Sequence, residues 1–153
     1  MAVKKDLIPM ILELKDTTLS LAGVTLWTDF SLIVKGGEIV TLSGWTRDNR
    51  KALMEVIWGL LPLDQGFVSI DGELITTLSA PYLRKKMAYL PHEVRWADEE
   101  RNKIPFVEQR KQLLEEIVKR QLKLLLMDDM STEEQLVCRQ LAEKGTAVIA
   151  FIE

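Results

Sequence analysis

A short apolar strand that runs directly into a helix is the feature that most restricts the fold of this chain. The run EIVTLS at residues 38–43 is mostly apolar and ends at Gly44, which is typical of a buried strand. Apolar residues at helical spacing follow between Leu53 and Trp58, and Gly59 closes that pattern. A buried strand that leads directly into an amphipathic helix predicts a parallel sheet covered by helices.

Further strands are predicted on both sides of this unit. Residues 10–42 alternate apolar and polar side chains around a Gly36-Gly37 turn, and GFVSIDGELI predicts a hairpin that turns at Asp71-Gly72. The runs MAYLP, LKLLLMDD and TAVIAFIE predict three buried strands, and EEQLVCRQLAEKG predicts a helix that Gly145 stops. Strand–helix–strand units near both ends of the chain reinforce the prediction of a parallel sheet.

Residues 93–120 differ in character, because they carry 7 acidic and 7 basic side chains. A helix is predicted from Pro105 to about Leu122, with one apolar face that packs on the sheet. The charge-rich stretch 93–111, including Trp96, is interpreted as a solvated surface rather than a docking site.

Composition excludes several classes of function. The chain has 153 residues, enough for one core, and its net charge of −3 argues against a general nucleic-acid binder. No apolar run approaches the ~20 residues that span a bilayer. The single cysteine, Cys138, excludes an internal disulfide, and the single histidine, His92, leaves no basis for a histidine-based zinc site. These features predict a cytoplasmic protein.

Placed in order, these segments resemble the nucleotide-binding domain of ABC-transporter ATPases. The segments that carry the resemblance are GEIVTLSG, LMEVIWGLLPLDQGFVSIDGELI, LRKKMAYLPHE, LKLLLMDD and AEKGTAVIAF. It is nearly continuous over residues 10–92 and resumes over 122–153. The resemblance implies an α/β fold with a P-loop NTPase-like core, a mixed sheet and an N-terminal antiparallel β-subdomain.

The resemblance also implies one domain, residues 1–153, in three parts. Residues 10–92 form the β-subdomain and the Walker A region, 93–121 a shortened helical segment, and 122–153 the Walker B-like strand, a helix and the last strand. Only 35 residues lie between His92 and Asp128, fewer than the helical subdomain of the family needs. That subdomain is therefore expected to be largely missing.

The Walker A positions carry unusual residues. The pattern G-x-x-x-x-G-K-[ST] wraps phosphates with backbone N–H groups, adds a lysine charge and supplies a hydroxyl for magnesium. Without gaps, Gly44 fills the first glycine, Asn49 the second, Arg50 the lysine and Lys51 the hydroxyl position. Arginine does not replace the compact ammonium of lysine, and Lys51 cannot bind a cation. Asp48 adds repulsion toward phosphate, so we expect a degenerate phosphate loop.

The other positions that the resemblance implies are also changed. Leu21 stands where an aromatic residue stacks on the base, and His92 where a glutamine senses the γ-phosphate. The LSGGQ-type signature is absent, and Glu153 takes the position of the switch histidine. Asp128 keeps the Walker B aspartate, whereas Asp129 replaces the catalytic glutamate with a shorter side chain that would position water poorly. Asp128, Asp129 and His92 are therefore vestigial catalytic residues.

Two cations thus stand opposite two carboxylates where a nucleotide and its metal would lie. We predict that Arg50 or Lys51 forms an internal salt bridge with Asp128 or Asp129, which neutralises charge as metal and nucleotide otherwise would. Trp45, in the same loop, has two open interpretations: it caps the pocket, or it faces a partner.

The sequence supports two hypotheses of function. In the first, the chain is a degenerate ABC-ATPase-like binding or regulatory module without ATP hydrolysis, with no cofactor and no metal. In the second, it is a divergent transporter subunit that still binds ATP or ADP weakly. Its cofactor would then be ATP-Mg, with Asp128 as the only metal ligand. Expected partners are an ABC-transporter subunit, an intact ATPase or a second copy of the chain, and the membrane is reached only through a permease. Nucleic acid is not an expected partner.

Overall fold

The computed structural model describes residues 8–92, 103 and 105–152. In this part of the chain the strands divide between two four-stranded sheets, one antiparallel and one parallel. Both strand directions that the sequence indicates are therefore present, in separate layers. The predicted α/β class and the N-terminal antiparallel β-subdomain are confirmed.

The antiparallel sheet has the strand order β2-β1-β4-β5. Its strands are β1 (Met10–Leu21), β2 (Val24–Lys35), β4 (Gln65–Ile70) and β5 (Glu73–Leu74). The β4–β5 hairpin turns at Asp71 and Gly72, which both have positive φ, as the Asp-Gly signal in the sequence predicts. In β1, Leu12, Leu14 and Leu19 are buried, so this sheet has one face on the core.

The parallel sheet has the strand order β3-β8-β7-β6. Its strands are β3 (Ile39–Ser43), β6 (Met87–Leu90), β7 (Leu124–Asp128) and β8 (Ala147–Ile152). All residues of β7 are buried, which agrees with its unbroken apolar sequence, because both faces of a parallel sheet are covered.

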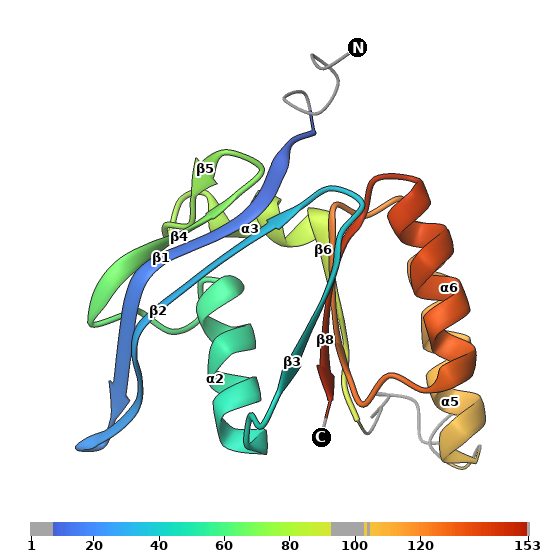
Figure 1. Cartoon of the computed structure of the whole chain (residues 1–153), viewed down its shortest axis with the longest axis horizontal. Helices are drawn as coiled ribbons and strands as arrows, with labels where there is room; N and C mark the ends of the chain where they lie inside the picture. The colour runs from blue at the N-terminus through green and yellow to red at the C-terminus, as the bar shows by residue number, and fades with distance from the viewer. Residues whose placement is uncertain (1–7, 93–102, 104, 153) are drawn as a thin grey trace.

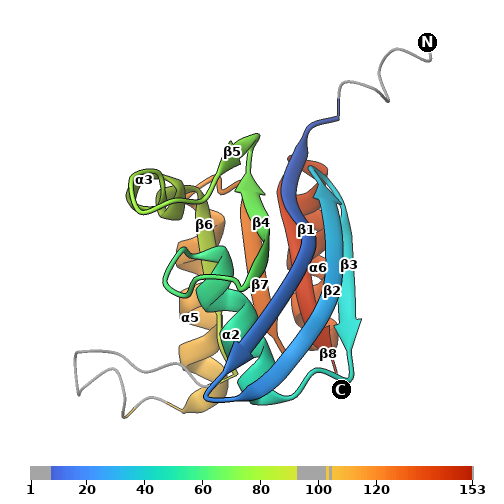
Figure 2. The same cartoon turned by 90° about the vertical axis from the view of Figure 1, so that its left-hand side faces the viewer.

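Helices cover both faces of the parallel sheet, as Figure 1 shows. Helix α2 (Arg47–Ile57) lies between the two sheets, whereas α5 (Phe106–Val118) and α6 (Thr132–Glu143) lie on the opposite face. The short helices α3 (Ala80–Leu83) and η1 (Arg84–Lys86) lead into β6. Figure 2 shows the antiparallel strands β1 and β2 in front of α2.

The alternation of side chains along the parallel strands divides the core in two. In β7, Leu124 and Leu126 pack with α2 and the antiparallel sheet, while Leu125 and Met127 pack under α5 and α6. Cys138 is fully buried in the second cluster. Each face of the parallel sheet therefore packs against its own apolar cluster. The polar residues of the candidate site lie at the carboxyl ends of its strands.

The helix predicted over residues 105–122 is shorter in the structure. Helix α5 ends at Val118, Lys119 forms its C-cap, and Gln121 has a left-handed φ of 52° that breaks the helix before β7. Leu122, which the sequence prediction includes in the helix, is instead a buried residue in the connection just before β7. The prediction for Trp96 lies outside the described residues.

Candidate functional site

The polar residues singled out in the sequence gather where the parallel strands end. β7 ends at Asp128, β3 ends at Ser43 just before α2, and His92 follows β6. In open α/β sheets, ligands bind outside this carboxyl edge. The topology therefore brings together residues from the Walker A-like and Walker B-like regions, as the resemblance implies.

An ion pair joins these two regions. The Nη1 atom of Arg50 lies 3.0 Å from Oδ1 of Asp129, and the Arg50 side chain is only 7% exposed. Arg50 also donates from Nε to the carbonyl oxygen of Trp45 at 3.1 Å, and its guanidinium lies 5.6 Å from the ring centre of Phe151. The predicted internal salt bridge is confirmed for Arg50 and Asp129.

Lys51 does not take part, which corrects the expectation that two cations face the two aspartates. Its side chain is 75% exposed, and its Nζ atom lies 4.0 Å from Glu55 one turn along α2. The reason is helical geometry, because consecutive residues point about 100° apart and only Arg50 faces the sheet. Lys51 thus forms an ordinary surface pair on the helix.

The phosphate-loop region is a helix over much of its length. Gly44 has a left-handed φ of 76°, but α2 already begins at Arg47, inside the segment that aligns with the Walker A pattern. Thr46 is the N-cap: its Oγ1 accepts from the N–H of Asn49 at 3.1 Å, and its carbonyl oxygen accepts from the N–H of Arg50 at 2.9 Å. Two backbone donors that would face a phosphate are therefore used by the helix itself.

The Asn49 side chain is also engaged inside the protein. Its Nδ2 atom donates to the carbonyl oxygen of Leu26 on β2 at 3.3 Å. This bond ties the first turn of α2 to the antiparallel sheet. The side chain at the position expected for the second Walker A glycine thus forms a hydrogen bond within the protein.

Trp45 packs against three aromatic side chains within the protein. Its ring centre lies 5.2 Å from that of Phe30, 5.7 Å from that of Trp27 and 5.9 Å from that of Phe151. These residues come from β2, the loop and β8. Trp45 therefore packs the loop against both sheets, and Trp27 and Phe30 are partly buried residues that pack against the same core.

Asp128 is buried at the end of β7 and is held by Tyr89 on the neighbouring strand β6. The Tyr89 hydroxyl donates to Asp128 Oδ2, and the backbone N–H of His92 lies 3.3 Å from the same oxygen. Burial and the hydrogen bond to Asp128 raise the pKa of Tyr89 far above its ordinary value. The Oδ1 atom of Asp128 is buried and has no hydrogen-bond partner among the described residues.

Asp129 turns away from the strand direction and contacts both Arg50 and His92. Its backbone has a left-handed φ of 51°, and its N–H donates to the carbonyl oxygen of Phe151 at 2.9 Å. His92 Nδ1 lies 2.6 Å from Asp129 Oδ2. Burial alone would raise the pKa of Asp129, but the bonds from Arg50 and His92 outweigh it and hold that pKa below its ordinary value.

Arg110 on α5 is a residue of this site that the sequence analysis did not identify. It is 7% exposed, and its Nη1 donates to the carbonyl oxygen of Pro91 at 2.8 Å. Its Nη2 donates to the carbonyl oxygens of Asp128 and Asp129, the second at 3.4 Å. Arg110 therefore holds the chain at the ends of β6 and β7. No signal distinguishes it from the other charges of residues 93–120.

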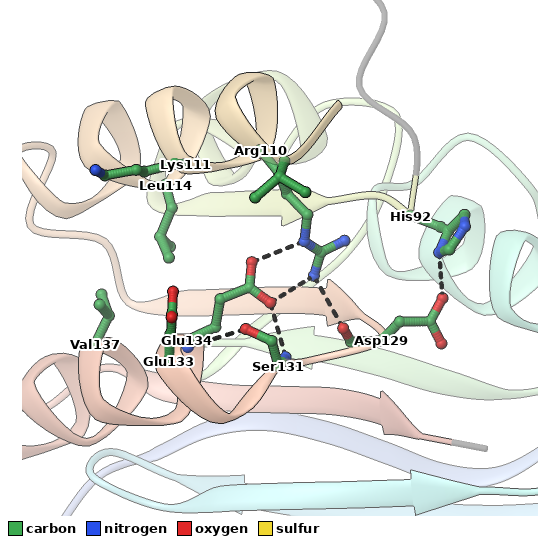
Figure 3. A pocket seen from close by; sticks show the side chains of 10 residues that line it. His92, Arg110, Lys111, Leu114, Asp129, Ser131, Glu133, Glu134 and Val137 are labelled. Carbon is green, nitrogen blue, oxygen red and sulfur yellow. Dashed lines mark hydrogen bonds and ion pairs between the residues drawn. The ribbon is translucent and has the colours of Figure 1, made fainter. Parts of the chain in front are cut away.

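Glu134 completes this group from α6, as Figure 3 shows. Arg110 Nε lies 2.7 Å from Glu134 Oε2, and Ser131 and Glu134 form a capping box at the start of the helix. Burial alone would raise the pKa of Glu134, but the bonds from Arg110 and Ser131 lower it. The S-x-x-E spacing of Ser131 and Glu134 was the signal in the sequence that could have identified this helix start.

Among the described residues, two cavities adjoin the site. The one at the sheet edge has a volume of about 180 Å³ and is lined by Arg47, Arg50, Pro91, His92 and Asp128. The other lies between α5 and α6, has a volume of about 340 Å³, and is largely apolar around Leu114 and Val137 (Figure 3). Small-molecule sites usually measure ~300–1,000 Å³, so the cavity at the sheet edge is small for a nucleotide.

The residues at the sheet edge fit ATP-Mg poorly. Lys51 supplies no hydroxyl, and one oxygen of Asp128 is taken by Tyr89. Among the described residues, no cluster of three or more His, Cys, Asp or Glu side chains could hold a metal. Leu21 lies at the tip of the β1–β2 hairpin, is 40% exposed, and is not among the residues that the Arg50–Asp129 pair brings together.

Curated proteins with similar sequences are ATP-binding proteins of importers. A spermidine/putrescine import ATP-binding protein, PotA, from Aggregatibacter actinomycetemcomitans is 34% identical over 70 residues, which is 46% of this chain and 19% of PotA. A ribose import ATP-binding protein, RbsA, from Rhodococcus jostii is 36% identical over 93 residues, which is 60% of this chain and 18% of RbsA. No family model matches the chain.

Solved structures match over nearly the whole chain. An ATP-binding subunit of an ABC transporter superposes with a TM-score of 0.77 at 14% identity, over 94% of this chain and 80% of that one. The chain therefore resembles ABC-transporter ATP-binding subunits in fold, and it resembles import ATP-binding proteins in sequence over part of its length. A second ATP-binding subunit, cbiO1 of Clostridium perfringens, described as part of the ABC transporter complex cbiONQ, gives 0.75 at 11% identity, over 94% of this chain and 78% of that one.

These matches confirm the family resemblance and the P-loop NTPase-like fold that the sequence implies. The chain spans less than a fifth of the length of these curated relatives. In the part of the chain that the structure describes, no helix combines the length and apolarity needed to cross a membrane.

Proposed function

We propose that this ABC-ATPase-like chain is a non-catalytic binding or regulatory module. Its partner would be an ABC-transporter subunit, an intact ATPase or a second copy, at the cytoplasmic side of a membrane that it reaches only through a permease. The observation that carries the proposal is the Arg50–Asp129 ion pair, which joins the Walker A lysine position to the catalytic glutamate position. Phosphoryl transfer needs both positions free to act on phosphate and water.

Two further observations support the proposal. The N–H groups of Asn49 and Arg50 already bond to Thr46 inside α2, so the loop has fewer donors left for a phosphate. The cavity beside Arg50 measures about 180 Å³, below the usual range for small-molecule sites.

A second candidate function is weak binding of ATP or ADP by a divergent transporter subunit. It is favoured by Arg47, which lines the sheet-edge cavity with Arg50 at the start of α2. A helix N-terminus and two guanidinium groups attract phosphate. This function requires Arg50 to exchange its carboxylate partner for the nucleotide.

A titration of the purified chain with ATP-Mg and ADP, followed by calorimetry and thermal unfolding, distinguishes the two functions. Ligand at a hundredfold excess over its dissociation constant stabilises a fold by ~2.7 kcal/mol. The non-catalytic module is expected to show an unchanged melting temperature at millimolar nucleotide. A magnesium-dependent rise would favour the second function instead.

Phosphate release provides an independent test of catalysis. The wild-type chain and Asp128→Ala are expected to release phosphate from ATP at the same background rate. Release by the wild-type chain that Asp128→Ala abolishes would refute the proposal, because the Walker B aspartate would then be catalytic. Circular dichroism of both proteins checks that the variant is folded.

A further inference from the structure

A large groove lies at the edge of the parallel sheet opposite the Arg50–Asp129 pair. Its volume is about 1,120 Å³, and its walls are the chain before β1, the β2–β3 turn, and the connections from α5 to β7 and from α6 to β8. In Figure 1 these connections lie at the upper end of the sheet, whereas β8 points toward the lower end.

The groove has an apolar floor. Ile11, Leu122 and Leu141 are at most 6% exposed there, and Val118 is half-buried beside them. Ile8 stands at the rim with 45% of its surface exposed. Ile8 and Val118 thus extend this buried floor with apolar surface that solvent reaches, which favours an apolar surface of a partner.

The charged lining residues are all cations. Lys119, Lys123 and Lys144 line the groove, and no carboxylate does among the described residues, although the whole chain has a net charge of −3. Helix-dipole stabilisation accounts for part of this pattern, because Lys119 caps α5 and Lys144 caps α6. It does not account for Lys123, which lies just before β7, or for the apolar floor.

Backbone hydrogen bonds hold the walls of the groove in place. The N–H of Gly36 donates to the carbonyl oxygen of Pro9 at 2.9 Å, and that of Gly37 donates to Thr146 at 3.2 Å. The Thr146 hydroxyl donates to the carbonyl oxygen of Leu122 at 2.8 Å. The contact at Gly36 is close, since a Cβ there would lie 2.9 Å from the carbonyl oxygen of Gly145. The groove is therefore pre-formed, which reduces the entropic cost of binding.

We propose that this groove docks an acidic, amphipathic segment of a partner protein. Its volume of about 1,120 Å³ gives room for a peptide segment, since it lies just above the ~300–1,000 Å³ of small-molecule sites. Charge complementarity with the three lysines selects carboxylates, and the floor selects apolar side chains at helical spacing. The inference rests on the proposed binding role, but it uses a surface at the opposite sheet edge from the vestigial nucleotide site.

The test uses a labelled synthetic helix of about 16 residues, roughly 24 Å long, with leucines on one face and glutamates flanking them. Fluorescence anisotropy is expected to show binding that weakens at least tenfold in Lys119→Glu/Lys123→Glu and also weakens in Ile8→Ser. The matched controls Lys15→Glu/Arg139→Glu and Leu78→Ser, which alter exposed residues on other surfaces, are expected to bind like wild type. Melting curves check that every variant is folded.

Two control peptides separate docking from simple charge attraction. A peptide with serines in place of the leucines and one with lysines in place of the glutamates are both expected to lose binding. The inference is overturned if the serine peptide binds equally well, if Lys119→Glu/Lys123→Glu binds the acidic helix like wild type, or if that helix does not bind. Preferential binding to phosphatidylserine vesicles would also overturn it in favour of a membrane surface. Because no nucleotide is added, these outcomes are independent of the ATP titration.

Discussion

Arg50 Nη1 lies 3.0 Å from Asp129 Oδ1, across 79 positions of sequence and between α2 and the end of β7. The arginine is almost fully buried, and the aspartate is 24% exposed. Removal of one partner from such a pair leaves an uncompensated buried charge, whereas the intact pair often contributes little net stability to the fold. Removal of only one partner is therefore expected to lower the stability of the fold more than removal of both.

Arg50→Ala is expected to lower the free energy of unfolding by about 1–3 kcal/mol, because Asp129 loses a charged donor and Trp45 loses a hydrogen bond. Urea unfolding followed by circular dichroism measures the change. Lys51→Ala is the matched control on the same helix turn, and its 75% exposed side chain predicts a change within about 0.5 kcal/mol. Equal effects of the two variants would contradict the role assigned to Arg50.

Acidification is expected to remove the contribution of Asp129. Its pKa is lowered in the folded chain, so the stabilisation is present above the ordinary aspartate pKa of ~3.9 and is lost as the pH falls through the folded value. Asp129→Asn should therefore be less stable than wild type at neutral pH, and the difference should shrink as the pH falls below about 4.

Urea unfolding at a series of pH values measures this convergence. Glu73→Gln, at an exposed residue of β5, controls for removal of a carboxylate as such. A constant difference between wild type and Asp129→Asn from pH 7 to pH 3 would show that the charge on Asp129 does not contribute.

The sequence predicts the layers of this fold well, because apolar runs and turn residues are local signals. The buried strand β7, the Asp71-Gly72 turn and the helix stop at Gly145 all follow from neighbours in the chain. The ion pair could also be predicted from the sequence, since the family resemblance implies that Arg50 and Asp129 lie at one sheet edge.

The remaining features of the site depend on long-range packing. Arg110 is one of many charges in residues 93–120, and only the position of α5 against β7 and α6 makes it buried. The early start of α2 depends on Thr46, whose capping competes with the open loop that the Walker A alignment suggests. Lys51 was assigned to the site from alignment alone, and the direction of its side chain on the helix excludes it.

Tyr89→Phe is expected to lower the free energy of unfolding by about 1–3 kcal/mol, because the Tyr89 hydroxyl donates to the buried carboxylate of Asp128. The same hydrogen bond predicts that the Tyr89 hydroxyl loses its proton only at high pH. In a Tyr82→Phe background, where Tyr89 is the only tyrosine, tyrosinate absorbance should appear only well above pH 10. Stability should then fall as the pH rises above about 10, because the unfolded chain ionises first. Tyrosinate absorbance at pH 10 in folded protein would contradict the bond to Asp128.

Arg110→Ala is expected to be the most destabilising of these changes, at about 3–5 kcal/mol, because it leaves Glu134 and three backbone carbonyl groups without their donor. Arg110→Lys should recover only part of the loss, since an ammonium cannot make the two-pronged contact with Glu134. Glu134→Gln keeps the shape of the capping box and should cost less than Arg110→Ala, because the carbonyl contacts of Arg110 remain. Urea unfolding ranks the three variants, and full recovery in Arg110→Lys would show that charge alone, without the planar geometry, holds the ends of β6 and β7.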